Sequence, residues 1–68
     1  MKISARNQIR GTVISVRPGA VSATLKIDIG GGNIITSSIT GEAVADLSLK
    51  EGDEVTVIIK ASDVIIGK

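Results

Sequence analysis

The sequence predicts an all-β domain: a small barrel of about five short strands, with one short helix before the last long strand. Residues 21–29 alternate between apolar and polar side chains without an error, as a half-buried strand does. Segments that contain Pro or Gly separate this run from other runs rich in β-branched residues. The length of 68 residues allows one domain, residues 1–68, and no run of about 20 apolar residues is present that could span a bilayer.

The first two strands are expected to form a hairpin. Residues 11–17 are rich in β-branched side chains and end at Pro18, which fixes φ, and at a glycine that permits a positive φ. Strand 21–29 follows, with one apolar and one polar face. The triple-glycine segment 30–33 makes the next turn, before a strand of mixed polarity at residues 34–40.

The single helix is expected at residues 41–47. Thr40 is available as its N-cap, and Glu42 places an acidic group in its first turn. A second alternating strand is expected at residues 54–60, and residues 64–66 are expected to add a final edge strand. This order of elements indicates a five-stranded barrel of the OB-like kind.

Composition excludes several classes of site. The chain has no His, no Cys and no aromatic residue, so imidazole ligands, thiolates and stacking platforms for bases are absent. Eight basic residues against seven acidic ones, scattered without runs, give no electrostatic footprint for a nucleic acid or an anionic membrane surface. Without His or Cys, a nucleophile would need a Ser/Lys pair such as Ser62 with Lys60. At a spacing of i, i+2 beside a strand end, such a pair is far more often two solvated side chains, so we expect no enzymatic activity.

The chain is expected to be an oligomer in the cytoplasm. A single core of this size seldom supplies enough stability without disulfides, metals or subunit contacts, and the large burial that aromatic residues provide is missing here. The N-terminus lacks the apolar segment of a secretory signal, and there is no cysteine framework.

What remains is a set of hydrogen-bond donors in three short polar clusters at the ends of the expected elements. The clusters are Ser4-Ala5-Arg6-Asn7, Thr40-Gly41-Glu42 and Lys60-Ala61-Ser62. Each has a structural interpretation as well: backbone satisfaction in a turn, a helix N-cap, and a solvated lysine at a strand end. Together they favour an anionic ligand, because hydroxyls, backbone N–H groups and cations all donate.

Several segments resemble the molbindin (molybdenum-pterin-binding, Mop) family, whose members are small stand-alone versions of the TOBE domain. The resemblance covers the chain from end to end. It is carried by Ile3-Ser4-Ala5-Arg6-Asn7-Gln8-Ile9-Arg10-Gly11, Gly19-Ala20-Val21-Ser22, Ile39-Thr40, Leu47-Ser48-Leu49, Glu51-Gly52-Asp53-Glu54-Val55 and Ile59-Lys60-Ala61-Ser62-Asp63-Val64.

The resemblance implies a binder of molybdate or tungstate, built on a five-stranded OB-like barrel. It implies assembly as a hexamer, a trimer of dimers, with oxyanions held between subunits. One subunit would supply Ser4, Ala5 and Arg6, and its neighbour would supply Thr40, Lys60, Ala61 and Ser62. A second oxyanion site would lie at Gly19, Ala20, Val21 and Ser22. No pterin is expected, because the chain has no aromatic ring to stack against one.

The chain departs from the family pattern at two positions. Ala43 stands where some relatives carry a hydroxyl, which removes a ligand donor, and Ser48 replaces the glycine usual between two leucines, which bears on the helix end. Two alternatives to an oxyanion store stay open. One is a regulatory or structural interaction module, since the TOBE architecture also occurs as an appended domain in transporter ATPases and transcriptional regulators. The other is an OB-like nucleic-acid binder.

Overall fold

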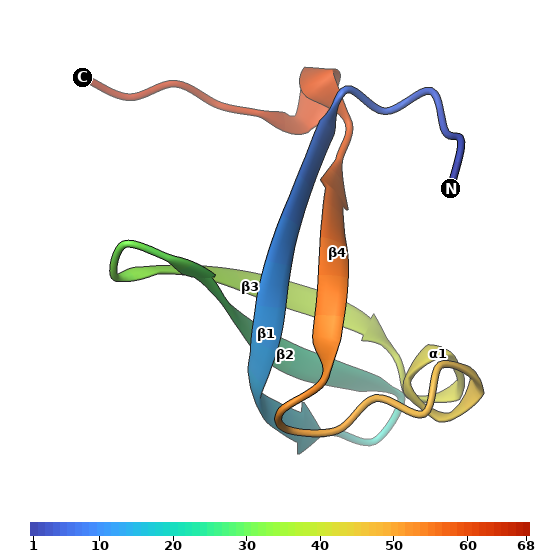
Figure 1. Ribbon diagram of the computed structural model, residues 1–68. Coiled ribbons are helices and arrows are strands. Elements are labelled where there is room, and N and C mark those ends of the chain that lie inside the picture. The colour runs from blue at the N-terminus through green and yellow to red at the C-terminus, as the bar shows by residue number, and fades with distance from the viewer.

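The computed structural model describes all 68 residues and confirms an all-β domain with one short helix (Figure 1). The elements are β1 (Asn7–Pro18), β2 (Ser22–Gly30), β3 (Asn33–Thr40), α1 (Gly41–Asp46), β4 (Glu54–Ile59) and a 3₁₀ turn, η1 (Ala61–Asp63). The predicted hairpins at Pro18 and at the triple glycine are both present. None of the helices is long and apolar enough to cross a membrane.

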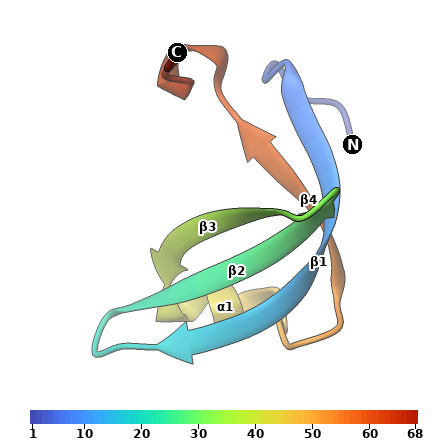
Figure 2. The ribbon, with the colours of Figure 1, turned by 90° about the vertical axis from the view of Figure 1, so that its left-hand side faces the viewer.

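The sheet is antiparallel and has the order β3-β2-β1-β4. The long strand β1 pairs with β4 along its first half and with β2 along its second half. The sheet bends at this change of partner, so that β2 and β3 cross the β1–β4 ladder at a steep angle (Figures 1 and 2). Gly11 lies at the bend, where a Cβ atom would stand 2.5 Å from Ile27 Cγ2 on β2. A side chain at this position would prevent the close approach of the two strands.

A β-bulge interrupts the pairing of β1 with β2 at Ile14. The register shifts between Val13 and Ser15, so one extra residue is accommodated on β1. Beyond the bulge, Val16 joins the core side of the sheet, while Arg17 points to the exposed side. The sequence pattern did not predict this change of phase.

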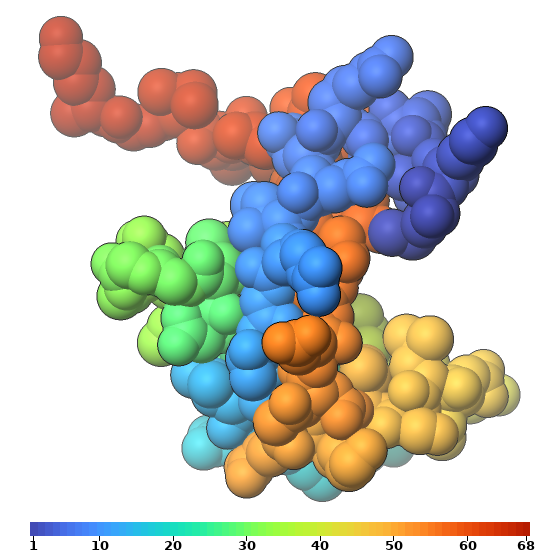
Figure 3. Space-filling model, viewed as in Figure 1, coloured from blue at the N-terminus to red at the C-terminus, as the bar shows by residue number.

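The predicted fifth strand is wrong: the sheet has four strands and is not closed. Residues 64–66 follow η1 and pair with no strand of the chain. The segment projects away from the body of the molecule (Figure 3), and Ile65 and Ile66 are 93% and 84% exposed. A strand needs a partner edge, and η1 directs this segment away from both free edges of its own sheet.

The core of the single chain is small. Only Val13, Ala23, Leu25 and Ile27 are buried, and partly buried apolar side chains from all four strands and α1 surround them. Several large apolar side chains are exposed instead, among them Val21 at 80%. Much of the apolar surface therefore lacks a partner within one chain.

The short helix α1 is defined by its two caps. Thr40 Oγ1 accepts a hydrogen bond from the Ala43 backbone N–H at 3.1 Å, which confirms the expected N-cap. At the other end, the Leu49 N–H donates to Val44 O at 3.0 Å and the Ser48 N–H to Ala45 O at 3.1 Å, which is a Schellman motif. Ser48 has a φ of 51° and is the only non-glycine residue with a positive φ. The departure at Ser48 thus falls where the helix end favours glycine.

The turn that leads into β4 is closed by Lys50 and Asp53. The Asp53 carboxylate accepts hydrogen bonds from Lys50 Nζ at 3.1 Å and from the Lys50 backbone N–H at 3.0 Å. Both hydrogen bonds hold the pKa of Asp53 below its usual range, and the side-chain hydrogen bond has the larger effect. The turn also docks on β1, because the Gly52 N–H donates to Val13 O at 2.8 Å.

Candidate anion-binding site

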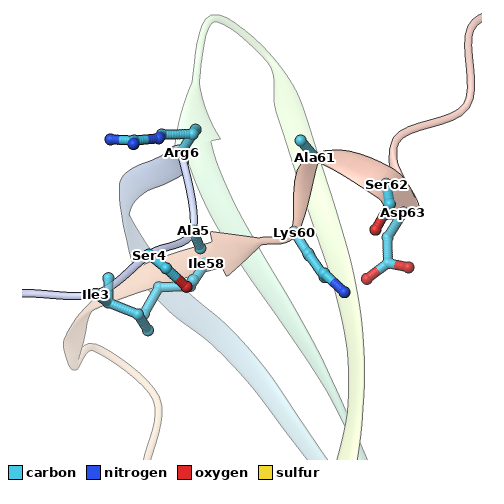
Figure 4. A pocket seen from close by; sticks show the side chains of 9 residues that line it. All are labelled: Ile3, Ser4, Ala5, Arg6, Ile58, Lys60, Ala61, Ser62 and Asp63. Carbon is cyan, nitrogen blue, oxygen red and sulfur yellow. The ribbon is translucent and has the colours of Figure 1, made fainter.

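A cavity of about 630 Å³ lies at the end of the β1–β4 ladder (Figure 4). Residues 3–6, which lead into β1, line one side of it, and residues 60–63, which follow β4, line the other. The two segments meet because Asn7 and Ile59 form the last pair of the ladder. The antiparallel pairing therefore brings the first and third predicted clusters together in one chain, whereas the resemblance implied that two neighbouring subunits supply them.

Side-chain hydrogen bonds fix the shape of this end of the molecule. Asn7 Nδ2 donates to Ile59 O at 3.1 Å and ties the two strands together at their ends. Gln8 Nε2 donates to Ala5 O at 3.1 Å, which holds the segment before β1. The Asp63 N–H donates to Lys60 O at 2.8 Å and closes η1. Asn7 thus has a structural role here, while its neighbours in the first cluster face the cavity.

The cavity is lined by donors that have no hydrogen-bond partner within the chain. The side chains of Ser4, Lys60 and Ser62 make no hydrogen bond, and no ion pair engages Lys60. The backbone N–H groups of Ala5, Arg6, Ala61 and Ser62 are also free. The latter two are free because they lie at the start of η1, where a helical turn offers no acceptor.

The two cations at the cavity are oriented differently. Figure 4 shows the Lys60 ammonium extending below η1, while the Arg6 guanidinium extends away from it on the other side of the cavity. Arg6 therefore contributes to the cavity with its backbone N–H, and Lys60 is the cation placed to meet a ligand in it.

Three lining residues were not among the predicted site residues: Ile3, Ile58 and Asp63. The two isoleucines add apolar side chains to the lining. Asp63 carries the only acidic side chain of the lining, on the same side as the Lys60 ammonium. Its place follows from the 3₁₀ turn, in which residues i and i+3 eclipse one another, so the spacing of Lys60 and Asp63 is the signal that could have found it.

Thr40 and the predicted second site lie beside α1, at the end of the molecule opposite the cavity (Figures 1 and 2). Thr40 pairs with Ser22, and the Gly41 N–H donates to Val21 O at 2.9 Å. The Gly19 N–H donates to Ser22 O at 2.8 Å across the β1–β2 turn. Neither Thr40 nor any of the four residues Gly19, Ala20, Val21 and Ser22 lines a cavity in the single chain.

Comparison with known proteins connects this architecture to proteins that bind molybdenum oxyanions. The model of the TOBE domain family matches residues 3–66. A probable molybdenum-pterin-binding protein of Haemophilus influenzae is 51% identical over 67 residues, which cover 98% of this chain and 97% of that protein.

Two solved structures are similar over nearly the whole chain. A molybdate-binding protein from Sporomusa ovata superposes with a TM-score of 0.93 at 40% identity, covering all of both chains. The cytoplasmic molybdate-binding protein ModG, in a form with molybdate bound, superposes with a TM-score of 0.91 at 48% identity. That match covers 96% of this chain and 46% of ModG.

Proposed function

Since this chain belongs to the TOBE domain family, among its molybdenum-pterin-binding (Mop) members, we propose that it binds molybdate reversibly at the end of the β1–β4 ladder. The observation that carries the proposal is the convergence of unpaired donors on one cavity. Hydroxyls of Ser4 and Ser62, free backbone N–H groups and the ammonium of Lys60 all lie there without a partner.

These donors suit a tetrahedral dianion. Molybdate carries no proton to donate at neutral pH, so every contact in its site must come from a donor. Hydrogen bonds to a charged group contribute about 1.5 to 3 kcal/mol each, so four or five of them reach about micromolar affinity after the cost of association. The small side chains of Ala5 and Ala61 leave their N–H groups accessible to the oxyanion.

The ligand that we propose is the bare oxyanion, molybdate or tungstate, without a pterin. The names of several relatives include pterin, but this chain offers no aromatic ring for a pterin to stack against. The proposed role is storage in the cytoplasm, with no bond made or broken, and the similar protein ModG is a cytoplasmic molybdate-binding protein.

We propose that the sites are completed in an oligomer, with a hexamer as the expected assembly. The small core and the exposed apolar side chains support subunit contacts. Thr40 lies at the start of α1, at the end of the molecule opposite the cavity of its own subunit, so a site that includes Thr40 requires a second copy. The same holds for the second site at residues 19–22, which forms no cavity alone.

Equilibrium dialysis against molybdate, tungstate and sulfate in parallel tests the proposal. We expect saturable binding of molybdate and tungstate at about micromolar concentration and weaker binding of the smaller sulfate. Native mass spectrometry of the same samples gives the number of subunits and the number of oxyanions per assembly. Equal binding of all three anions, or binding of none, contradicts the proposed function.

A further inference from the structure

A second polar pocket lies on the exposed face of the β1–β2 hairpin, away from the ladder end. It has a volume of about 290 Å³, and its lining consists of Ser15, Arg17, Thr24 and Lys26 alone. Pockets for small ligands begin at about 300 Å³ and are mostly apolar, so a pocket of this size without an apolar side chain is suited to a small, strongly polar ligand.

The pairing of the two strands places these side chains in a square. Ser15 lies opposite Lys26, and Arg17 lies opposite Thr24. Directly opposed residues have Cβ atoms about 5 Å apart and diagonal neighbours lie about 7 to 8 Å apart, so both cations occupy one diagonal and both hydroxyls the other. All four residues can therefore donate into the same space from different corners.

The bulge at Ile14 creates this arrangement. Without the shift of register, Ser15 and Arg17 would continue on the face of Val13, which is buried in the core. With the extra residue, both turn to the exposed face, and Ile14 itself is left 43% exposed. Bulges re-aim side chains and are frequent next to functional sites.

The charge at this pocket is not neutralised by the chain. Neither Arg17 nor Lys26 forms an ion pair, and Lys26 Nζ donates only to Thr36 Oγ1, at 2.7 Å on β3. The nearest acid along β2 is Asp28, whose carboxylate accepts a hydrogen bond from the Gly30 N–H at 2.8 Å. The pocket itself contains no acidic side chain.

We propose that this pocket is an additional anion-binding site and that it takes a diphosphate group. The guanidinium of Arg17 presents a planar fork that suits two phosphate oxygens, and Lys26 supplies a point charge on the opposite corner. Two cations on a diagonal serve two linked phosphoryl groups, one each, with the hydroxyls of Ser15 and Thr24 between them. The chain has no aromatic ring for a nucleobase, so the diphosphate is recognised without the rest of a nucleotide.

Isothermal titration calorimetry and ³¹P NMR on the full chain in its native assembly test this site, at low ionic strength in buffer free of phosphate and magnesium. The probes are pyrophosphate, orthophosphate and ADP. We expect saturable binding of pyrophosphate, about tenfold weaker binding of orthophosphate, and ADP binding no tighter than pyrophosphate. Tighter binding of ADP, or equal binding of pyrophosphate and orthophosphate, overturns the assignment to a diphosphate.

Matched variants locate the bound anion. Arg17→Gln and Lys26→Gln each weaken pyrophosphate binding at least about fivefold, and Thr24→Val, which keeps charge and strand propensity, weakens it about twofold. Lys68→Gln removes the same charge from the exposed C-terminal segment and leaves the affinity unchanged. Circular dichroism checks the fold of each variant, and Thr24→Val keeps the test decisive if a charge variant misfolds.

Three results overturn the site. One is the absence of saturable pyrophosphate binding at millimolar concentration. Another is an equal loss in Lys68→Gln, which would mean non-specific attraction to net charge. The third is loss of pyrophosphate binding in Lys60→Ala, which would place the anion in the cavity at the ladder end.

Discussion

Replacing Lys60 by alanine removes the one cationic side chain that extends into the cavity at the ladder end. Lys60 makes no hydrogen bond or ion pair within the chain, so its loss leaves no partner unsatisfied. It follows the last residue of β4, and its side chain is exposed, so the change leaves the sheet and its pairing intact. The variant therefore isolates the contribution of the ammonium group to binding.

The expected loss of molybdate affinity in Lys60→Ala follows from the exposure of the Lys60 side chain to solvent. A hydrogen bond between charged groups contributes about 1.5 to 3 kcal/mol, and solvent screening favours the lower end for an exposed lysine, so affinity for molybdate falls about tenfold. Titration calorimetry measures this loss, and native mass spectrometry checks that the assembly is unchanged. Lys60→Arg retains the charge and retains most of the affinity, while Lys68→Ala, at an exposed position outside the cavity, has no effect. Unchanged molybdate affinity in Lys60→Ala would refute the placement of the ligand beside this residue.

The other predictions concern the acid in the cavity, the helix end, the sheet bend and acid stability. Asp63→Asn removes from the cavity lining a negative charge that repels the molybdate dianion, so molybdate affinity measured by calorimetry rises about twofold to fivefold. Lower molybdate affinity in this variant would show that the carboxylate organises the site. Ser48→Gly relieves the positive φ of 51° and raises stability by about 1 kcal/mol, or at least about 4 °C in Tm at equal protein concentration. Gly11→Ala forces a Cβ to within 2.5 Å of a side chain on β2 and costs about 1 to 3 kcal/mol, whereas Gly67→Ala, with open space around it, leaves Tm unchanged. Because hydrogen bonds lower the pKa of folded Asp53, this carboxylate stabilises the fold above its unfolded pKa, and that contribution is lost as pH falls through the lowered pKa of the folded state. Denaturant titrations at pH 3 and pH 7 should show a smaller acid loss in Asp53→Asn than in the parent.

Local patterns predicted the elements whose signals are contained in a few neighbouring residues. The alternation over residues 21–29, the turn at Pro18 and the N-cap at Thr40 each depend on local chemistry, and the structure confirms them. The first strand was predicted from residue 11, yet it begins at Asn7. Its extension depends on pairing with β4, which is far away in the sequence.

The features that the local sequence pattern missed depend on pairing with other segments of the chain. Val13 and Val16, on either side of the bulge, are β-branched and fit either face of a strand, so they gave no signal of the bulge. The apolar residues 64–66 have strand propensity but no edge to pair with in the single chain. For the candidate site, the family resemblance assigned Ser4 and Lys60 to neighbouring subunits, whereas the register of β1 with β4 places both in the lining of one cavity of a single chain.

The cavity at the ladder end depends on the pairing of β1 with β4, which joins distant parts of the chain. The hydrogen bond from Asn7 to Ile59 joins residues 52 positions apart, whereas the β1–β2 and β2–β3 hairpins are local. Contacts between distant parts of a chain cost more loop-closure entropy and form late. Both hairpins can form before β4 has paired with β1, but the cavity at the ladder end exists only after that pairing. Under the proposed function, molybdate binds only the paired ladder end and therefore stabilises this last step of folding by mass action.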